Sequence, residues 1–352
     1  MIDRRPSLRF GTGSRMLAVL LALGFTSLLI VVAGASPIES FRLLWEGSVG
    51  TSDKLANTLM TWVPLVLASA GLVVTFSAGL WNIGVEGQIV MGAVAASWVA
   101  REVHVGTPTI ITVALLAGLV GGLLWGLLAG ALRVYGRVNE IFGGLGLDFV
   151  ATGFVVYLVI GPWKRAGIAS TSGTDPFPRE AWLPTIGNKL APIAVILAVL
   201  AVVGVYLLMR GTYFGLRLKA VGANPASAFI VGIRTHRYLL AAMAIGGALA
   251  GVAGTIQAIG FQHKLVPAIS GGYGFLGILV VLLAAYRAAL IAPIAFFFVM
   301  ISVGSSQLSL RLGLDSSIGG VIQGSLVLIA ILVGGWQVQQ RARRRSDPAA
   351  ES

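Results

Sequence analysis

Runs of about 20 mostly apolar residues, the length that an α-helix needs to cross a bilayer, follow one another along almost the whole chain. Ten such runs predict an all-α, polytopic integral membrane protein with about ten transmembrane helices. One run opens with polar residues (83–100) and one is short (273–286), so either could be a broken or re-entrant helix. The expected spans are 16–34, 55–78, 83–100, 110–132, 141–161, 191–209, 238–260, 273–286, 288–307 and 317–335.

The overall composition excludes most soluble classes of protein. Hydrophobic residues fill 57% of the 352 positions and charged residues 11%, whereas soluble domains average about 25% charged residues. The net charge of +12 comes from residues between the apolar runs, which predicts contact with anionic lipid headgroups and not with nucleic acid. The lack of cysteine excludes disulfides, thiolate metal sites and cysteine catalysis.

Motifs of catalysis and cofactor binding are missing as well. The chain has no G-x-x-x-x-G-K-[ST] phosphate loop and no G-x-S-x-G motif, and its three histidines are scattered over separate loops. Gly272–Gly277 matches G-x-G-x-x-G, but no strand precedes it and no acidic residue follows about 20 positions later, so we interpret the match as coincidental. We expect no catalytic residue, no metal and no cofactor on this chain.

The distribution of Lys and Arg predicts the orientation. With a cytoplasmic N-terminus, the inner segments hold 16 of the 25 basic residues, as the positive-inside rule requires. Ten spans then give a basic cytoplasmic tail (1–15), a transmembrane domain (16–335) and a second basic cytoplasmic tail (336–352). Ala33–Ala35 resembles a signal-peptide cleavage site, but the apolar stretch before it exceeds the usual length of about 7–15 residues, so we expect the first span to be retained.

A short helix is expected directly after the first span. Ser36 and Glu39 fit the capping box S-x-x-E, and Pro37 suits the first helical position. Apolar residues at helical spacing follow, so this helix either lies in the outer membrane interface or packs on the helix bundle.

Glycines at four-residue spacing predict close helix packing. Because glycine has no side chain, such a row lets the backbone of another helix approach closely. The interface is either static or one that moves during function. The row consists of Gly118, Gly122, Gly126 and Gly130, and the same spacing returns at Gly247 and Gly251.

Acidic residues inside the spans mark a candidate site. Glu86 and Asp148 lie within apolar runs, where a charge costs about 2.5–3.5 kcal/mol on insertion scales. Asn82 and Gln88 lie within about a turn of Glu86 on a helix. This polar group could line a solute path, or it could clamp helices together or cap a helix start.

The segment 210–237 is expected to be a cytoplasmic loop that contains a short helix. Asn224 can cap this helix, Pro225 suits its first position and Gly232 can end it. A short helix held between two spans and flanked by arginines is suited to dock in a groove of another protein, although the pattern also fits a plain loop helix.

Several of these segments resemble the permease subunits of ABC importers for simple sugars and nucleosides. The likeness is to the nucleoside branch, which works with basic-membrane-protein-like binding lipoproteins, and it extends in order over most of the chain. The segments are Gly79–Gln88, Leu218–Ile233, Leu265–Pro267 and Gly272–Phe275.

The resemblance implies a function and a set of partners. It implies a permease in a bacterial plasma membrane that moves nucleosides or simple sugars delivered by an external solute-binding lipoprotein. A second permease subunit, identical or homologous, would pair with it, and separate ATPase subunits would bind and hydrolyse ATP. The loop helix would couple to the ATPase through Gly222, Asn224, Pro225, Ala226, Ala228 and Gly232.

The same resemblance gives the polar residues a role in solute transport. Amide and carboxylate groups would bind the hydrogen-bonding groups of a nucleoside, and aromatic rings could stack on its base or serve only as packing. The alternative is an ion-gradient-driven secondary transporter or channel, with Glu86 and Asp148 as a proton or sodium pair. The candidate pathway residues are Asn82, Glu86, Gln88, Trp81, Asp148, Tyr273 and Phe275.

Overall fold

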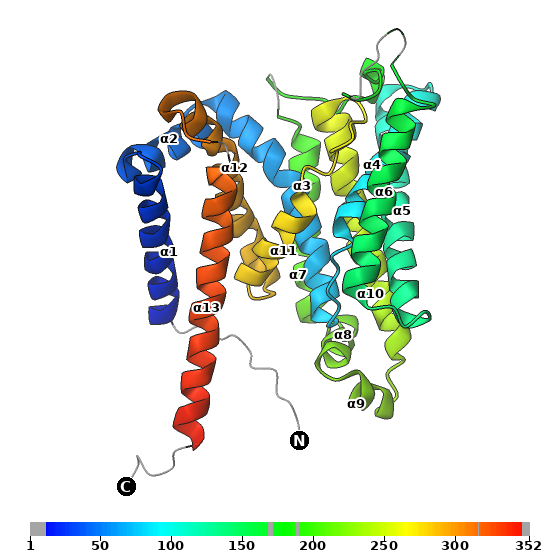
Figure 1. Cartoon of the computed structure of the whole chain (residues 1–352). Coiled ribbons are helices and arrows are strands. Elements are labelled where there is room, and N and C mark those ends of the chain that lie inside the picture. Colours follow the sequence, from blue (N-terminus) through cyan, green and yellow to red (C-terminus); the bar gives the residue numbers. More distant parts are fainter. Residues whose placement is uncertain (1–11, 166, 168–171, 188–189, 316, 347–352) are drawn as a thin grey trace. The chain divides into compact units, whose positions relative to one another are not determined.

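A computed structural model describes residues 12–165, 167, 172–187, 190–315 and 317–346 of the chain. The regular structure of these residues is helical, with one isolated backbone bridge between Ile186 and Leu190, which confirms the predicted all-α class (Figure 1). The helices are α1 (Thr12–Val32), α2 (Pro37–Val49), α3 (Ser52–Ser77), α4 (Val85–Glu102), α5 (Thr107–Val134), α6 (Glu140–Ile160), η1 (Arg179–Ala181), α7 (Pro192–Gly211), α8 (Tyr213–Ala223), α9 (Pro225–Ile230), α10 (Thr235–Thr255), η2 (Ile256–Gln262), α11 (Tyr273–Leu283), α12 (Ala288–Leu312) and α13 (Ile318–Ser346).

Each of the ten predicted runs coincides with a helix, and within the described part of the chain six segments are long and apolar enough to cross a membrane. These are α3, α5, α6, α7, α10 continued by η2, and α12. The end of α1 and α2 form a further candidate, bent by 105°. By contrast, α4 has three charged residues among its 18, and α11 is only 11 residues long. Ten spans and cytoplasmic termini therefore stay predictions.

Helix ends differ from the expectation in two places. The helix after the first span does begin at Pro37, but the predicted capping box is wrong, because the Ser36 side chain makes no capping hydrogen bond. Only its carbonyl takes part, accepting the amide of Ser40. The short span predicted over 273–286 ends early at Leu283, since Ala285 and Tyr286 adopt left-handed conformations.

The two basic tails are described only in part. Residues 1–11 and 347–352 lie outside the described residues. Of the N-terminal tail, Thr12 and the following residues already belong to α1. Of the C-terminal tail, the part up to Ser346 continues α13 as a helix.

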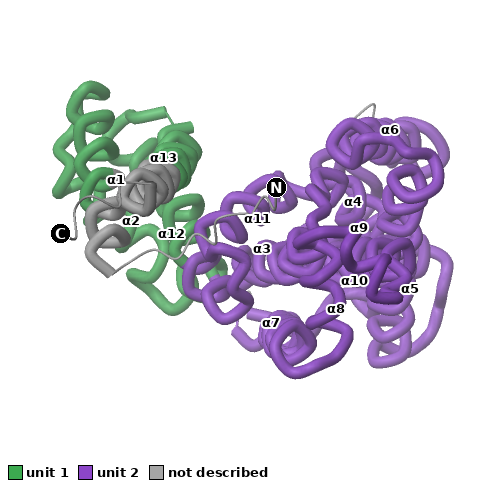
Figure 2. The backbone as a smooth tube through the Cα atoms, turned by 90° about the horizontal axis from the view of Figure 1, so that it is seen from below, with its two compact units in different colours: residues 1–58, 297–352 green, residues 59–296 purple. Residues whose placement is uncertain are grey.

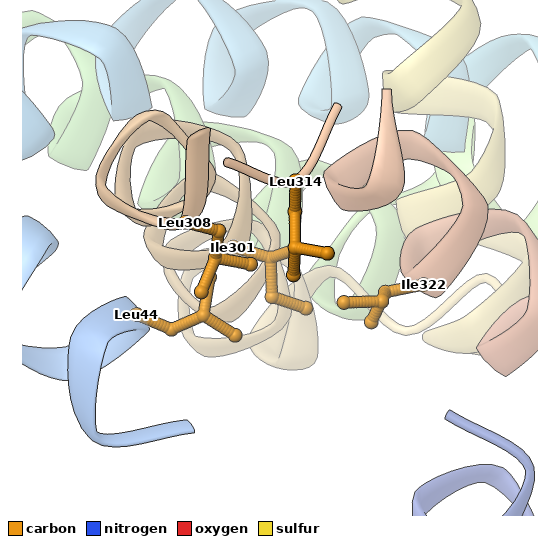
Figure 3. Close-up of a cluster of buried hydrophobic side chains, with 5 residues drawn as sticks. All are labelled: Leu44, Ile301, Leu308, Leu314 and Ile322. Carbon is orange, nitrogen blue, oxygen red and sulfur yellow. The ribbon is translucent and has the colours of Figure 1, made fainter. Parts of the chain in front are cut away.

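The chain divides into two compact units, residues 1–58 with 297–352, and residues 59–296 (Figure 2). In the first unit α1 packs on α13. Gly47 of α2 lies against the backbone of Gly304 and the side chain of Gln307 in α12, so these two helices approach closely. The first unit has a small apolar core, which consists of Leu44, Ile301, Leu308, Leu314 and Ile322 (Figure 3).

The second unit is built on three helices, α4, α5 and α10, which pack on one another. The predicted glycine row on α5 faces the glycines of α10, and this confirms the expected close approach. Gly122 lies against Gly247 and Gly251, and a methyl group on any of the three would overlap backbone atoms of the facing helix. The opposite side of α5 exposes large apolar side chains such as Leu116 and Leu124, as expected of a helix that faces lipid.

Candidate functional site

A turn of seven residues, 78–84, joins α3 to α4 and begins the polar cluster. Asn82 lies in this turn and Gln88 in the first turn of α4, and both are almost fully buried, at 1% and 0% exposure. The two side-chain amides bind each other reciprocally: Asn82 Nδ2 donates to Gln88 Oε1, and Gln88 Nε2 donates to Asn82 Oδ1, each at 3.0 Å. The turn is thereby fixed to the start of α4, and each amide has one donor and its acceptor engaged.

Glu86, on the same first turn, reaches a different helix. Its carboxylate accepts the backbone amide of Gly272 at 2.9 Å through Oε1 and that of Gly274 at 2.7 Å through Oε2. The Ser270 side chain and the Phe275 amide are further hydrogen-bond partners. The carboxylate thus joins the first turn of α4 to the first turn of α11.

Asp148 of α6 contacts α4 from another direction. Its Oδ1 accepts the amide of Gly87 at 2.8 Å. Its Oδ2 is buried without a hydrogen-bond partner in the structure, and so is Nε1 of Trp125 on α5. Both side chains lie against Gly87, where a methyl group would come within 3.0 Å of Trp125 Nε1. Gly87 therefore lets three helices meet at a buried polar point.

The predicted aromatic residues lie in two places. Tyr273, the first residue of α11, is hydrogen-bonded to the side chains of Gln257 and Thr61. Phe275, on the same turn of α11, is 46% exposed. Trp81 is 42% exposed, and its ring centroid lies 5.2 Å from that of Phe76 near the C-terminal end of α3. Tyr273 and Phe275 thus share a turn of α11 with the Glu86 contact, while Trp81 lies next to the amide pair.

Sequence reasoning missed four polar residues of this region. Ser270, Gln257, Thr61 and Trp125 all lie close to the predicted set, as hydrogen-bond partners or as a buried neighbour. The one usable signal was Gln257, because a lone amide within the apolar run 238–260 is as unusual as Glu86 in its own run.

The loop between α6 and α7 also went unpredicted as part of this region. It runs along the end of the π-helix η2 and is held there by backbone contacts: the amide of Leu183 donates to Ile259 and that of Phe177 donates to His263. Trp182 stacks on the His263 ring with centroids 3.8 Å apart, and Arg179 lies over Trp182. This loop fixes the irregular segment that precedes α11.

The loop expected over 210–237 has the predicted capped helix. Asn224 Oδ1 accepts the amide of Ser227 at 3.1 Å, Pro225 is the first residue of α9, and Gly232 follows the helix with a φ of +83°. Gly222 lies one helix earlier, in α8. There it packs against the backbone of Gly79, in the turn that leads to Asn82. The loop is thus in direct contact with the turn that starts the polar cluster.

The α8–α9 loop exposes an apolar surface. Ala228 is buried at 3% exposure, whereas Ala226 is exposed, so only the latter is accessible to another molecule. The large exposed side chains of this surface, which we call the loop surface, are Tyr213, Leu216, Phe229, Ile230 and Val231. They lie between charged residues of a loop, and an exposed apolar patch of this kind is typical of an interaction site.

Long apolar helices, buried polar clusters between them and an exposed apolar loop define a multi-pass helical membrane protein. A family model described as "Branched-chain amino acid transport system / permease component" matches residues 54–332, and the chain belongs to this family. This confirms the resemblance to ABC importer permeases. The chain is a transport subunit and not an enzyme. Among the described residues, no group of three or more His, Asp or Glu could hold a metal ion.

Individual relatives are named as ABC transporter permeases. The chain is 30% identical to the glucose ABC transporter permease protein TsgB13 of Haloferax volcanii, over 91% of this chain and 87% of the relative. It is 27% identical to the guanosine ABC transporter permease protein NupP of Bacillus subtilis, over 89% and 91%. With the nucleoside ABC transporter permease protein NupB of Lactococcus lactis subsp. cremoris, identity is 25% over 82% of each.

Proposed function

We propose that this chain is the permease subunit of an ABC importer that carries nucleosides, or simple sugars, across a bacterial plasma membrane. Relatives named for guanosine, nucleosides and glucose support this range of solutes. A second permease subunit, identical or homologous, pairs with the chain, and an external solute-binding lipoprotein delivers the solute. Separate ATPase subunits bind and hydrolyse ATP.

The α8–α9 loop is the observation on which the proposal rests. Its short helix has a side-chain cap and a proline start, so it is a defined element and not a flexible connection. The loop surface is exposed and apolar, which suits insertion into a groove of an ATPase. The coupling residues are those of the predicted set, with Ala226 at the surface and Ala228 inside the loop.

The contact between Gly222 and Gly79 gives the loop a mechanical connection to the polar cluster. Because no side chain separates these two glycines, a displacement of α8 moves the turn 78–84 directly. That turn is tied to α4 by the Asn82–Gln88 pair. Closure of the ATPase subunits would therefore reach the solute pathway through α8 and the start of α4.

The solute pathway runs past the polar cluster. Trp81 and Phe275 have the flat rings and the accessible area that stacking on a nucleoside base requires, whereas the ring of Tyr273, on the same turn of α11 as Phe275, is only partly exposed. The polar members, Asn82, Glu86, Gln88 and Asp148, lie beside them on α4, on α6 and in the turn before α4. A pathway of this kind binds a ring by its faces, and the polar cluster holds in place the turn and the helix that carry the rings.

A charge on the loop surface tests the coupling role. The variant Phe229→Asp should reduce co-purification of a co-expressed ATPase subunit and ATP-dependent uptake about tenfold or more, equal to about 1.4 kcal/mol of binding free energy. The control is Ile186→Asp, which places the same charge at an exposed isoleucine of the α6–α7 loop, 71% exposed. Equal ATPase recovery with both variants would contradict the assignment.

An ion-gradient-driven transporter is the second candidate. Asp148 favours it, because a buried carboxylate oxygen without a hydrogen-bond partner could take up a proton or a sodium ion. Uptake that follows an ion gradient and is abolished by Asp148→Asn would support this candidate over the first.

A further inference from the structure

Backbone amides at the start of α11 have no hydrogen-bond acceptor within their own helix. Gly271 and Gly272 both have positive φ, +59° and +75°, and Gly272 is the N-cap of α11. The first amides of a helix have no intrahelical acceptor, and a glycine N-cap supplies no side-chain oxygen. Gly274 is buried and Gly272 is half-buried, so water does not replace the missing acceptor.

Glu86 supplies the acceptor from another helix. Its two oxygens take the amides of Gly272 and Gly274, at 2.9 and 2.7 Å. A negative charge at a helix N-terminus is favourable, and hydrogen bonds to a carboxylate are stronger than those between neutral groups. The space is matched as well, because a methyl group on Gly274 would overlap the carboxylate. The G-x-G pattern therefore does bind an anion, and the anion is a side chain of the same protein.

We propose that Glu86 is a positioning residue that anchors the first turn of α11, and that it does not bind the solute directly. Both of its oxygens are engaged by backbone amides, and the side chain is 8% exposed, so little acceptor capacity is left for a solute. The turn that it holds contains Tyr273 and Phe275. The proposal rests on the proposed function in this respect, since it places these two rings on the solute pathway.

The variant Glu86→Gln tests the anchoring by hydrogen exchange. The glutamine oxygen can accept one amide, but its NH₂ group faces the other as a second donor, so one hydrogen bond is lost. In the full complex in nanodiscs, amides of residues 270–276 should exchange about tenfold faster than in the wild type. The matched control is Glu102→Gln, which removes an exposed carboxylate at the other end of α4 and should leave this exchange unchanged.

Gly274→Ala provides an independent second variant. Its methyl group displaces the carboxylate while the charge of Glu86 remains, so anchoring predicts the same faster exchange over 270–276. In uptake assays both variants should lower the maximal rate as well as the apparent affinity, because the rings lose their position. Unchanged exchange in Glu86→Gln, with a weaker apparent affinity as the only defect, would overturn the proposal and make Glu86 a solute ligand.

Failure of this proposal is distinguishable from failure of the proposed function. The exchange of residues 270–276 needs neither solute nor ATP, so it reports on anchoring even if the cargo is of another class. Faster exchange in both variants supports the anchor whichever solute is carried. Unchanged exchange in both overturns it, even where ATP-dependent nucleoside uptake is established.

Discussion

The interface between α5 and α10 and the contact between α4 and α11 lie in the same unit but are built in opposite ways. At the first, Gly122, Gly247 and Gly251 bring two backbones together with no side chain between them. At the second, the Glu86 carboxylate holds the start of a short helix through backbone amides. Close backbone packing allows almost no rearrangement, whereas a few hydrogen bonds can break and re-form. The comparison separates a contact that depends on the absence of side chains from one that depends on a single carboxylate.

The largest expected effect on stability comes from a substitution in the glycine contact between α5 and α10. Gly122→Ala places a methyl group on backbone atoms of Gly247 and Gly251, which cannot move aside as a side chain would. The free energy of unfolding should fall by about 3 kcal/mol, measured by thermal unfolding of the purified protein. The control is Gly204→Ala on α7, where no atom lies within 4 Å of the added methyl group. There the change should be a gain of at most about 1 kcal/mol. Equal destabilisation by both would contradict the packing difference.

A smaller effect is expected at the amide pair that fixes the turn before α4. Asn82→Ala leaves the buried Gln88 side chain without its partner, which should cost about 1–3 kcal/mol. The combined variant Asn82→Leu with Gln88→Met removes both polar groups and should cost less than the sum of Asn82→Leu alone and Gln88→Met alone. A double-mutant cycle by thermal unfolding measures this difference. Strict additivity would mean that the two amides do not interact.

The smallest expected effect is a pH dependence at the loop that holds the end of η2. Burial lowers the pKa of His263 below its ordinary value of 6.5. The native state therefore binds the proton less readily than the unfolded state, so stability is unaffected above pH 6.5 and declines as the pH falls below it. Since the ring is only half buried, the loss should stay below about 1 kcal/mol. Unfolding at pH 7.5 and 5.5 measures it, and His263→Gln should remove that part of the dependence; an unchanged pH profile would contradict it.

Features that depend on neighbouring residues could be predicted from the sequence. Asn224 caps an amide three positions later, Pro225 starts the helix beside it, and Gly232 ends it, so α9 could be predicted with its caps. Close packing along the glycine row on α5 could be predicted in the same way, because residues three to four positions apart lie on the same face of a helix.

Features that depend on distant partners could not be predicted. Glu86 binds Gly272, 186 positions away, and no local pattern indicates which amides a buried carboxylate reaches. The π-helix η2 was missed because its sequence reads as an ordinary apolar run, while its end is fixed by the α6–α7 loop through Leu183 and Phe177. The capping box at Ser36 failed for a related reason: a suitable sequence allows a side-chain cap but does not require it.

The most direct test of the proposed transport function is uptake by the reconstituted complex. The chain is placed in proteoliposomes with its partner permease, the ATPase subunits and the binding lipoprotein, and uptake of labelled nucleosides and monosaccharides is measured. We predict uptake that requires ATP and the ATPase subunits and that is insensitive to collapse of ion gradients. Uptake by the chain alone, driven by a proton or sodium gradient without any ATPase, would contradict the proposal.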